Sequence, residues 1–194
     1  MKYTLFSLFL LLTTIGFSQL KVGDSAPDFN LKNTDTKMVS LSSYDTKGAI
    51  IIFTCNHCPY AKAYEGRIKA LHQKYKTEFP VIAINPNDPK QYPEDSYENM
   101  IIRSKKKGFT FPYLFDSTQN VAKGYGALKT PHVYLLEKKG EEFIVKYIGA
   151  IDDNYVDEKK VKEKYLENAI QALLKNETPN PATTKAIGCS IKWK

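Results

Sequence analysis

The pattern of hydrophobic and polar positions contains two short, continuous apolar runs. Residues 49–54 read Ala-Ile-Ile-Ile-Phe-Thr, and residues 81–85 read Val-Ile-Ala-Ile-Asn. Runs of this length and composition are typical of strands that are buried on both faces, as in the middle of a mixed or parallel sheet. The pattern therefore predicts two core strands.

Between the two runs, the apolar positions take up helical spacing. They recur three or four residues apart after Pro59, at Ala61, Tyr64, Ile68, Leu71 and Tyr75. These intervals place them on one face of a helix. Proline suits the first helical turn because an N–H group there would have no partner. We therefore expect the first core strand to pass directly into a helix, with residues 55–58 at the junction.

The remaining segments alternate between strand and helix patterns. We expect a small hairpin within residues 20–48 and a helix from the N-cap Ser96 to Lys107. A short aromatic strand at residues 109–115 and at most two helical turns at residues 116–123 should follow. A hairpin then begins at Thr130-Pro131 and returns through Phe143, Val145 and Tyr147, and a last helix covers residues 156–175. Such alternation indicates helices on both faces of a sheet. The predicted fold class is α/β, with a central mixed β-sheet flanked by helices and an N-terminal β-hairpin extension.

The first 18 residues have a different composition. Lys2 is the only charged residue among them, residues 8–12 are all apolar, and small residues stand at positions 16 and 18. This is the pattern of a cleavable secretory signal peptide, and its apolar run is shorter than the roughly 20 residues that a membrane anchor needs. We expect residues 1–18 to be removed and the protein to be exported to the periplasm or the extracellular space, with no other membrane association.

Two further segments follow the predicted signal peptide. Residues 19–176 are long enough for one domain with a substantial core. Residues 177–194 contain two prolines and indicate an extended linker followed by a C-terminal arm that carries Cys189. Ile191 and Trp193 are apolar enough to dock this arm on the domain.

The net charge of the chain gives little information about the class of molecule that it binds. The formal net charge is +7 for the 194 residues, but basic residues are interspersed with acidic ones. The densest cluster, residues 105–107, could bind nucleic acid or could be the solvated end of a helix. Lysines at that end complement the helix dipole, and Gly108 can cap it. Export also argues against nucleic acid, so we expect no such partner.

Two of the three cysteines, Cys55 and Cys58, lie at the strand-to-helix junction. Unpaired backbone N–H groups and the positive end of the helix dipole favour a thiolate there, and the order along the chain assigns it to Cys55. Nucleophiles of Cys-x-x-Cys motifs at helix starts have pKa values from about 3.5 to about 7, against ~8.5 for a free cysteine. We therefore expect Cys55 to be a nucleophile of lowered pKa and Cys58 the more buried resolving thiol, with no cofactor.

Three features, in this order, resemble the thioredoxin superfamily, redoxin branch. They are the motif Gly-Asp-x-Ala-Pro-x-Phe at residues 23–29, the strand-CxxC-helix unit, and Thr130-Pro131 at the opening of a late hairpin. The resemblance covers roughly residues 20–175, and residues 55–60, 85–88, 92–96 and 188–193 look like those of exported peroxiredoxin-like proteins. It implies a thioredoxin-like fold and thiol-disulfide exchange with protein or small thiol substrates and an upstream redox partner.

The resemblance also implies roles for residues around the two cysteines. Pro131 is the cis-proline that faces the site, which leaves the backbone of Thr130 free to pair with an extended substrate segment that carries a cysteine. Asn56, His57 and Pro59 complete the set that is expected to tune the site.

His57 has two interpretations. A histidine immediately before the second cysteine also occurs in DsbA-type oxidants, in which a low thiol pKa makes the disulfide strongly oxidising. A proton on His57 would stabilise the Cys55 thiolate in the same way. Alternatively, His57 faces solvent and has no effect on the sulfurs.

Two departures from the family pattern affect the chemistry. Thioredoxin has a buried aspartate where this chain has Ala49, so that route of proton transfer is absent. True peroxiredoxins have threonine or serine where this chain has Cys55, so peroxidase chemistry loses an activating hydroxyl. A thiol peroxidase is therefore an alternative function rather than the first one.

A further alternative is a copper- or zinc-handling module in which Cys55, Cys58 and His132 or Cys189 bind the metal. One Cys-x-x-Cys without a second cysteine pair is a weak metal signal, so no metal is expected. Cys189 could instead be a second resolving thiol, or a packed or free thiol without a redox role. The sequence does not predict the direction of electron flow or the oligomeric state.

Overall fold

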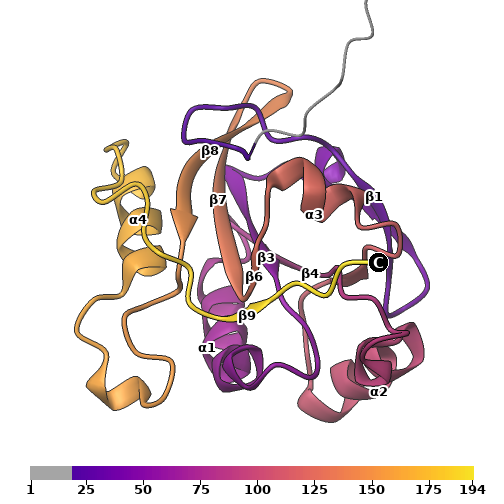
Figure 1. Ribbon diagram of the computed structural model, residues 1–194. Coiled ribbons are helices and arrows are strands. Elements are labelled where there is room, and N and C mark those ends of the chain that lie inside the picture. The colour runs from indigo at the N-terminus through magenta and orange to yellow at the C-terminus, as the bar shows by residue number, and fades with distance from the viewer. Residues whose placement is uncertain (1–18) are drawn as a thin grey trace, which may run out of the picture.

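Strand β3 (Gly48–Phe53) lies inside a seven-stranded mixed sheet, as its apolar run predicts (Figure 1). This computed structural model describes residues 19–194, so the predicted signal peptide at residues 1–18 lies outside the described residues. The strand order is β2-β1-β5-β4-β3-β7-β8. β4 is parallel to both β3 and β5, whereas the other neighbours are antiparallel. The predicted α/β class with a central mixed sheet is confirmed.

The elements follow the predicted order. The sheet consists of β1 (Asn30–Asn33), β2 (Met38–Ser40), β3, β4 (Val81–Asn85), β5 (Tyr113–Phe115), β7 (His132–Lys139) and β8 (Glu142–Gly149), and a separate pair is formed by β6 (Lys129–Thr130) and β9 (Cys189–Ser190). The helices are α1 (Pro59–Tyr75), α2 (Tyr97–Lys107), α3 (Asn120–Tyr125) and α4 (Tyr165–Leu174), with 3-10 turns η1 (Leu41–Ser43), η2 (Pro93–Asp95) and η3 (Glu158–Lys160). No helix within residues 19–194 has the length and apolar character that a membrane crossing requires.

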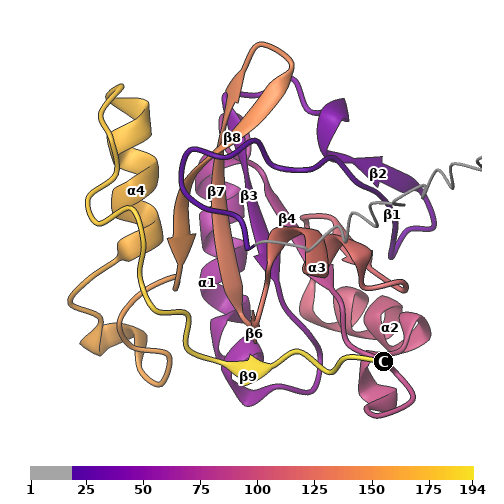
Figure 2. The same ribbon diagram turned by 45° about the horizontal axis from the view of Figure 1, so that its top comes forward.

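Alternate side chains of β3 point into two apolar layers, one on each face of the sheet. Ile50 and Ile52 pack with residues of α1, α2 and α4. Ile51 and Phe53 pack with residues of α3, of the segment before β1, and with Ile191 near the C-terminus. Figures 1 and 2 show helices around both sides of the sheet. Because both faces are covered, β3 and β4 need continuous rather than alternating apolar residues.

Helix α2 has the ends that the sequence predicts. The Ser96 side chain accepts a hydrogen bond from the backbone N–H of Asn99 (3.3 Å) and so caps the start of the helix. Gly108, in the left-handed conformation, caps the end after three lysines. The lysine cluster is therefore a solvated helix end, as expected.

The predicted amino-terminal hairpin is confirmed, but it is more than an extension. β1 pairs antiparallel with β5 as well as with β2, so the hairpin forms the edge of the main sheet. The side chain of Asn33 accepts a hydrogen bond from the backbone N–H of Tyr113 (2.8 Å) and so helps to fix this pairing. The hairpin turn is a local feature of the sequence, whereas its partner β5 is remote along the chain.

The last helix is shorter than predicted. α4 begins at Tyr165, whereas residues 156–164 form one 3-10 turn and a non-helical return. All residues from 157 to 164 except Val161 are charged, so this stretch has no apolar face to bury. Its backbone makes hydrogen bonds with Asp153 instead.

The C-terminal arm (residues 177–194) runs from α4 to the edge of the sheet at which β3 and β4 end (Figure 2). It first lies beside β8, where Thr183 forms a bridge with Ile148. β9 then pairs with β6, and Ile191 is buried in the apolar layer that contains α3. Trp193 packs on the same layer. The predicted docking of the arm through Ile191 and Trp193 is confirmed.

The first residue of β3 leaves no space for a side chain. A Cβ atom on Gly48 would lie 2.0 Å from the carbonyl oxygen of Leu136 and 2.7 Å from Cε1 of Phe79. We predict that Gly48→Ala lowers the free energy of unfolding by about 1–3 kcal/mol or more, because the added methyl group overpacks the strand. Urea unfolding followed by circular dichroism measures this change.

Gly66 provides the matched control. It is exposed in α1, and a Cβ atom there would meet nothing within 4 Å. Gly66→Ala should raise the free energy of unfolding by about 1 kcal/mol, the difference in helix propensity between the two residues. Equal unfolding free energies for Gly48→Ala and the wild type would contradict the close packing of β3 described above.

Candidate functional site

Cys55 and Cys58 lie where β3 gives way to α1, as predicted. β3 ends at Phe53, and Cys58 is the N-cap of α1, whose first residue is Pro59. Both sulfurs contact Thr130. The Cys55 sulfur lies 3.3 Å from the Thr130 hydroxyl oxygen, and the Cys58 sulfur lies 3.2 Å from the Thr130 carbonyl oxygen. The structure therefore brings both motif cysteines to the residue that precedes the predicted cis-proline.

The peptide bond between Thr130 and Pro131 is cis, as the resemblance implies. The backbone of Thr130, however, is not free. It pairs antiparallel with Cys189 in β9. The chain's own arm thus lies where a substrate segment was expected to pair.

The disulfide of the site joins Cys58 to Cys189, with 6.1 Å between the two Cα atoms, and Cys55 is a free thiol. A Cys55–Cys58 disulfide, which the motif predicts, is not the bond present in this state. The reason is that β9 places Cys189 beside Cys58 although 131 positions separate them in the sequence. Cys189 is therefore bonded to the motif, and a redox role for it stays a prediction.

The three cysteines differ in exposure. The exposed fraction is 3% for Cys55 and 0% for Cys58, whereas Cys189 is only partly buried. Cys58 is therefore the more buried of the two motif cysteines, as expected, but Cys55 is also buried in this state. Cys55 packs in an apolar cluster with Cys58 and Ala61, against which Cys189 lies.

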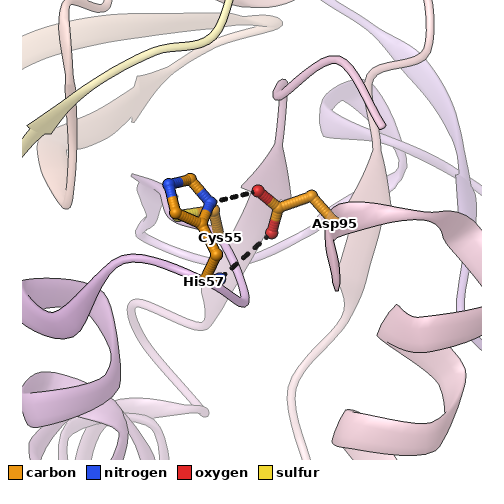
Figure 3. Close-up of side chains that lie close together, drawn as sticks. All are labelled: Cys55, His57 and Asp95. Atoms are coloured by element: carbon orange, nitrogen blue, oxygen red, sulfur yellow. Dashed lines mark hydrogen bonds and ion pairs between the residues drawn. The ribbon is translucent and has the colours of Figure 1, made fainter. Parts of the chain in front are cut away.

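Asp95, at the end of η2, is a site residue that the sequence interpretation missed (Figure 3). It is fully buried, and one carboxylate oxygen accepts hydrogen bonds from the backbone N–H groups of Asn56 (2.6 Å) and His57 (3.3 Å). The other oxygen lies 2.5 Å from Nδ1 of His57 and accepts a hydrogen bond from the Asn87 side chain (2.8 Å). The signal that could have found Asp95 is its place in the proline-rich loop after β4, because ligands of open sheets bind at that edge.

His57 points into the protein rather than into solvent. Its side chain is 12% exposed, and its ring stacks on Tyr92 with 4.0 Å between the ring centroids. The alternative of a solvent-facing histidine is therefore wrong. Asn56, its neighbour, accepts a hydrogen bond from the Tyr113 hydroxyl (2.9 Å) and donates one to the carbonyl oxygen of Glu94 (2.7 Å). These contacts fix the loop between β3 and α1.

The pKa of the Cys55 thiol is raised to about 11, opposite to the predicted lowering. Burial is the largest cause, and the negative charge of Asp95 adds to it. Hydrogen bonds from the Thr130 hydroxyl and from the backbone N–H groups of Cys58 and His57 favour the thiolate. The donors that were expected at the helix start are therefore present, but burial and the nearby carboxylate outweigh them.

One group of side chains within residues 19–194 has the composition and spacing to hold a metal ion. The sulfur of Cys55, a ring nitrogen of His57 and a carboxylate oxygen of Asp95 lie within 4.8 Å of one another. Asp95 and His57 already bind each other. The His57–Asp95 pair is therefore satisfied without an ion, and the Cys55 sulfur contacts the Thr130 hydroxyl instead.

The metal ligand sets considered from the sequence are not assembled in this state. Cys58 and Cys189 are bonded to each other, which leaves neither as a free thiolate. Nδ1 of His132 accepts a hydrogen bond from the backbone N–H of Leu128 (3.3 Å), and burial lowers the pKa of His132 to about 4. His132 is thus a neutral, buried strand residue.

Comparison with known proteins places the chain among redox proteins. The model of the AhpC/TSA family matches residues 22–151. The chain is 28% identical over 147 residues to the thiol-disulfide oxidoreductase ResA from Geobacillus thermodenitrificans, which covers 69% of this chain and 79% of ResA.

Two solved structures resemble most of the chain. An uncharacterized conserved protein from Geobacillus kaustophilus is 38% identical, with a TM-score of 0.81 over 90% of this chain and 93% of its own. A hypothetical protein from Sinorhizobium meliloti 1021 is 31% identical, with a TM-score of 0.83 over 91% of this chain and 97% of its own. More distant solved structures confirm the thioredoxin-like fold.

The titration of Cys55 can be followed in the disulfide-bonded chain, in which it is the free thiol. We predict that its thiolate absorbance appears only as the pH approaches about 11, so that the protonated thiol predominates at neutral pH. Asp95→Asn removes the negative charge and should move the pKa of Cys55 downward. The same variant should therefore be alkylated faster at a mildly alkaline pH.

Two controls accompany this titration. Asp45→Asn removes the same charge from a fully exposed side chain and should leave the pKa of Cys55 unchanged. The 13 tyrosines also absorb as they ionise in this pH range, so the difference between the wild-type and Cys55→Ser titrations isolates the thiolate signal. If Asp95→Asn and Asp45→Asn gave the same Cys55 titration curve, Asp95 would not be the charge that acts on this thiol.

Proposed function

The chain belongs to the AhpC/TSA family, and we propose that it is a thiol-disulfide oxidoreductase that exchanges disulfides with protein or small thiol substrates through Cys55, Cys58 and Cys189. The observation that carries the proposal is the disulfide between Cys58 and Cys189 in one apolar cluster with the free thiol of Cys55. Similarity to ResA, a thiol-disulfide oxidoreductase, supports the same chemistry.

Exchange among the three sulfurs needs no oxidant and no reductant. The Cys55 thiolate attacks the sulfur of Cys58, the Cys58–Cys189 bond breaks, and Cys189 leaves as a thiolate. One disulfide replaces another, so no net electrons are transferred. Cys55 loses one proton and Cys189 gains one. The product carries the Cys55–Cys58 disulfide. The Cys58–Cys189 disulfide of this structure and the Cys55–Cys58 disulfide predicted from the motif are therefore two isomers in equilibrium.

Proton transfer from Cys55 is the difficult part of this step. Because its pKa is raised to about 11, few molecules hold the thiolate at neutral pH unless a base takes the proton. We assign this role to His57, whose ring lies in the same cluster as the Cys55 sulfur. Asp95 positions the ring through Nδ1. A histidine held by a carboxylate is a common general base.

With the Cys55–Cys58 disulfide formed, the chain can oxidise a dithiol partner. A partner thiolate attacks one motif sulfur and forms a mixed disulfide while the other motif sulfur leaves as a thiolate. The second partner thiol then attacks the mixed disulfide, so the partner departs oxidised and the chain is left with reduced cysteines. The reverse sequence reduces a partner disulfide, and the relative reduction potentials set the direction.

We also propose that this exchange takes place outside the cytoplasm, in the periplasm or the extracellular space, with an upstream redox partner that restores the starting state. The support is the signal-peptide pattern of residues 1–18. Disulfides persist in such oxidising compartments.

The two alternative functions have less support from the site. The resemblance would make Cys58 the peroxide-reactive cysteine of a thiol peroxidase, but in this state Cys58 is bonded to Cys189 and has no free thiol to react with peroxide. A copper- or zinc-handling module would need the same thiols that this disulfide occupies.

Disulfide mapping tests the exchange. We predict that the chain, equilibrated in mixtures of reduced and oxidised dithiothreitol, contains both the Cys58–Cys189 and the Cys55–Cys58 disulfide. Their ratio should not depend on the buffer potential, because their interconversion transfers no electrons. A ratio that follows the potential, or the complete absence of Cys55–Cys58, would contradict the proposed equilibrium.

Single cysteine variants assign the roles through the rate of insulin disulfide reduction. Cys58→Ser should lose the activity, since Cys58 is the sulfur shared by both disulfides. Cys55→Ser should lose at least about tenfold, or 1.4 kcal/mol in the barrier. Cys189→Ser should keep the Cys55–Cys58 couple and a measurable rate. Rapid consumption of hydrogen peroxide that is lost in Cys58→Ser but not in Cys55→Ser would favour the peroxidase instead.

A further inference from the structure

The end of the C-terminal arm lies against the site as an extended strand. In β9, Cys189 pairs with Thr130 and Ser190 pairs with Lys129, both antiparallel, directly before Pro131. Figure 1 shows β9 crossing the end of β6 close to the start of α1. The main-chain pairing of β9 with β6 brings the Cys189 sulfur to the Cys58 sulfur, to which it is bonded. Sheet edges bind extended peptides by the same kind of main-chain pairing.

The residue before Cys189 fits only because it has no side chain. A Cβ atom on Gly188 would lie 2.3 Å from the carbonyl oxygen of Thr130, 2.7 Å from its carbonyl carbon and 3.0 Å from the nitrogen of Pro131. All three atoms belong to the backbone at the cis-proline, so they cannot move aside as a flexible side chain can. The surface therefore accepts glycine at this position and excludes larger residues.

The second residue after Cys189 occupies an apolar position. Ile191 is 4% exposed, and its backbone N–H donates to the carbonyl oxygen of Leu128 (3.2 Å). Its side chain joins the apolar layer that contains α3. Ser190, between Cys189 and Ile191, is exposed. The alternation of an exposed and a buried position is that of an edge strand with one side-chain pocket.

The backbone of the next residue, Lys192, is hydrogen-bonded on both sides, and its side-chain Nζ lies 5.1 Å from the centroid of the Tyr92 ring. The N–H group of Lys192 donates to the side chain of Asn87 (2.9 Å), and its carbonyl oxygen accepts from the backbone N–H of Asp88 (2.9 Å) and from Nε2 of Gln119 (2.8 Å). Asn87 also donates to Asp95 at the site. The backbone contacts hold any residue in extended form and add affinity without sequence preference, whereas the contact with Tyr92 favours a basic residue at this position.

The segment that leads into β9 is less firmly packed. Lys185 and Ile187 are exposed. A cavity of about 420 Å³, lined by Leu128, His132 and Ile148 among others, lies beside residues 183–186. Residues 185–187 form no strand pairing of the kind that holds β9 in place.

We propose that residues 188–191 of the arm are a tethered substrate, and that the surface they occupy selects external protein substrates with an extended Gly-Cys-Xaa-aliphatic segment. This rests on the proposed function. Cys55 first attacks Cys58 and releases Cys189. The arm then leaves β6, and a substrate segment pairs in its place. The substrate thiolate attacks Cys58, a Cys58–substrate disulfide forms, and Cys55 leaves as a thiolate. Each step exchanges one disulfide for another without net electron transfer.

The experiment uses peptides as the external thiol. The disulfide-bonded full chain is mixed with a synthetic peptide that has the sequence of residues 186–194, Ala-Ile-Gly-Cys-Ser-Ile-Lys-Trp-Lys. Mass spectrometry measures the rate at which a peptide–Cys58 disulfide forms. Peptides with alanine for the glycine, or with asparagine for the isoleucine that follows the serine, should react at least about tenfold more slowly, because the Cβ clash and the lost apolar contact weaken docking before the chemical step. A peptide with alanine for the serine should match the parent.

Oxidised glutathione serves as the reference disulfide for all four peptides. It reports their intrinsic thiol reactivity, by which the rates with the chain are normalised. Equal normalised rates for the four peptides would overturn the tethered-substrate proposal while leaving thiol-disulfide exchange intact. Failure of every peptide to react, with dithiothreitol still reducing the Cys58–Cys189 bond, would overturn it too. Failure of dithiothreitol and of the peptides alike would refute the proposed function itself.

A variant of the chain provides the complementary measurement. Gly188→Ala should push the arm off β6 and make Cys189 more readily exchanged, so the parent peptide should react several-fold faster with this variant than with the wild type. Gly66→Ala, the exposed helical glycine, is the matched control and should leave the rate unchanged. An unchanged rate in Gly188→Ala would show that the arm does not compete with the peptide and would also overturn the proposal.

Discussion

Thr130 is the residue through which the three sulfurs are held together. Its hydroxyl contacts the sulfur of Cys55, its carbonyl oxygen contacts the sulfur of Cys58, and its backbone pairs with Cys189. Thr130 is itself fully buried, so these contacts are made away from competing water. The geometry of the site therefore depends on one short strand, β6, between α3 and the core hairpin of β7 and β8.

Burial of the site changes the chemistry that a Cys-x-x-Cys at a helix start usually shows. The thiolate of Cys55 would be stabilised by the helix-start donors, but it lies in an apolar cluster beside the carboxylate of Asp95. In such surroundings, the neutral thiol is the more stable form. The resident Cys58–Cys189 disulfide is thus protected from attack by Cys55 until a base takes the proton.

The buried carboxylate near the sulfurs belongs to Asp95, which lies on a different element from the aspartate of thioredoxin. Ala49 stands where thioredoxin has its buried aspartate, and it is part of the apolar layer with α3. Asp95 instead approaches from the loop after β4 and holds the backbone of Asn56 and His57 as well as the imidazole ring. One buried acid thereby shapes the loop between the cysteines and sets the charge that Cys55 experiences.

Much of the fold was predictable because its signals are local. The apolar runs of β3 and β4, the proline at the start of α1 and the caps of α2 depend on residues next to one another. The same is true of the position of the motif between strand and helix. The local pattern failed at residues 156–164, where charged residues of good helix propensity lack an apolar face to bury.

The sequence by itself determined that two thiols stand at a strand-to-helix junction, opposite a Thr-Pro that opens a late hairpin. Only the tertiary structure decided which sulfurs bond, which acid faces them and how deeply they are buried. The disulfide joins positions 131 residues apart, and Asp95 reaches Asn56 across 39 residues. Spacing along the chain cannot encode such contacts, since they arise from strand pairing and loop packing between distant segments. Burial and charge, and hence the raised pKa of Cys55, exist only once those segments have met.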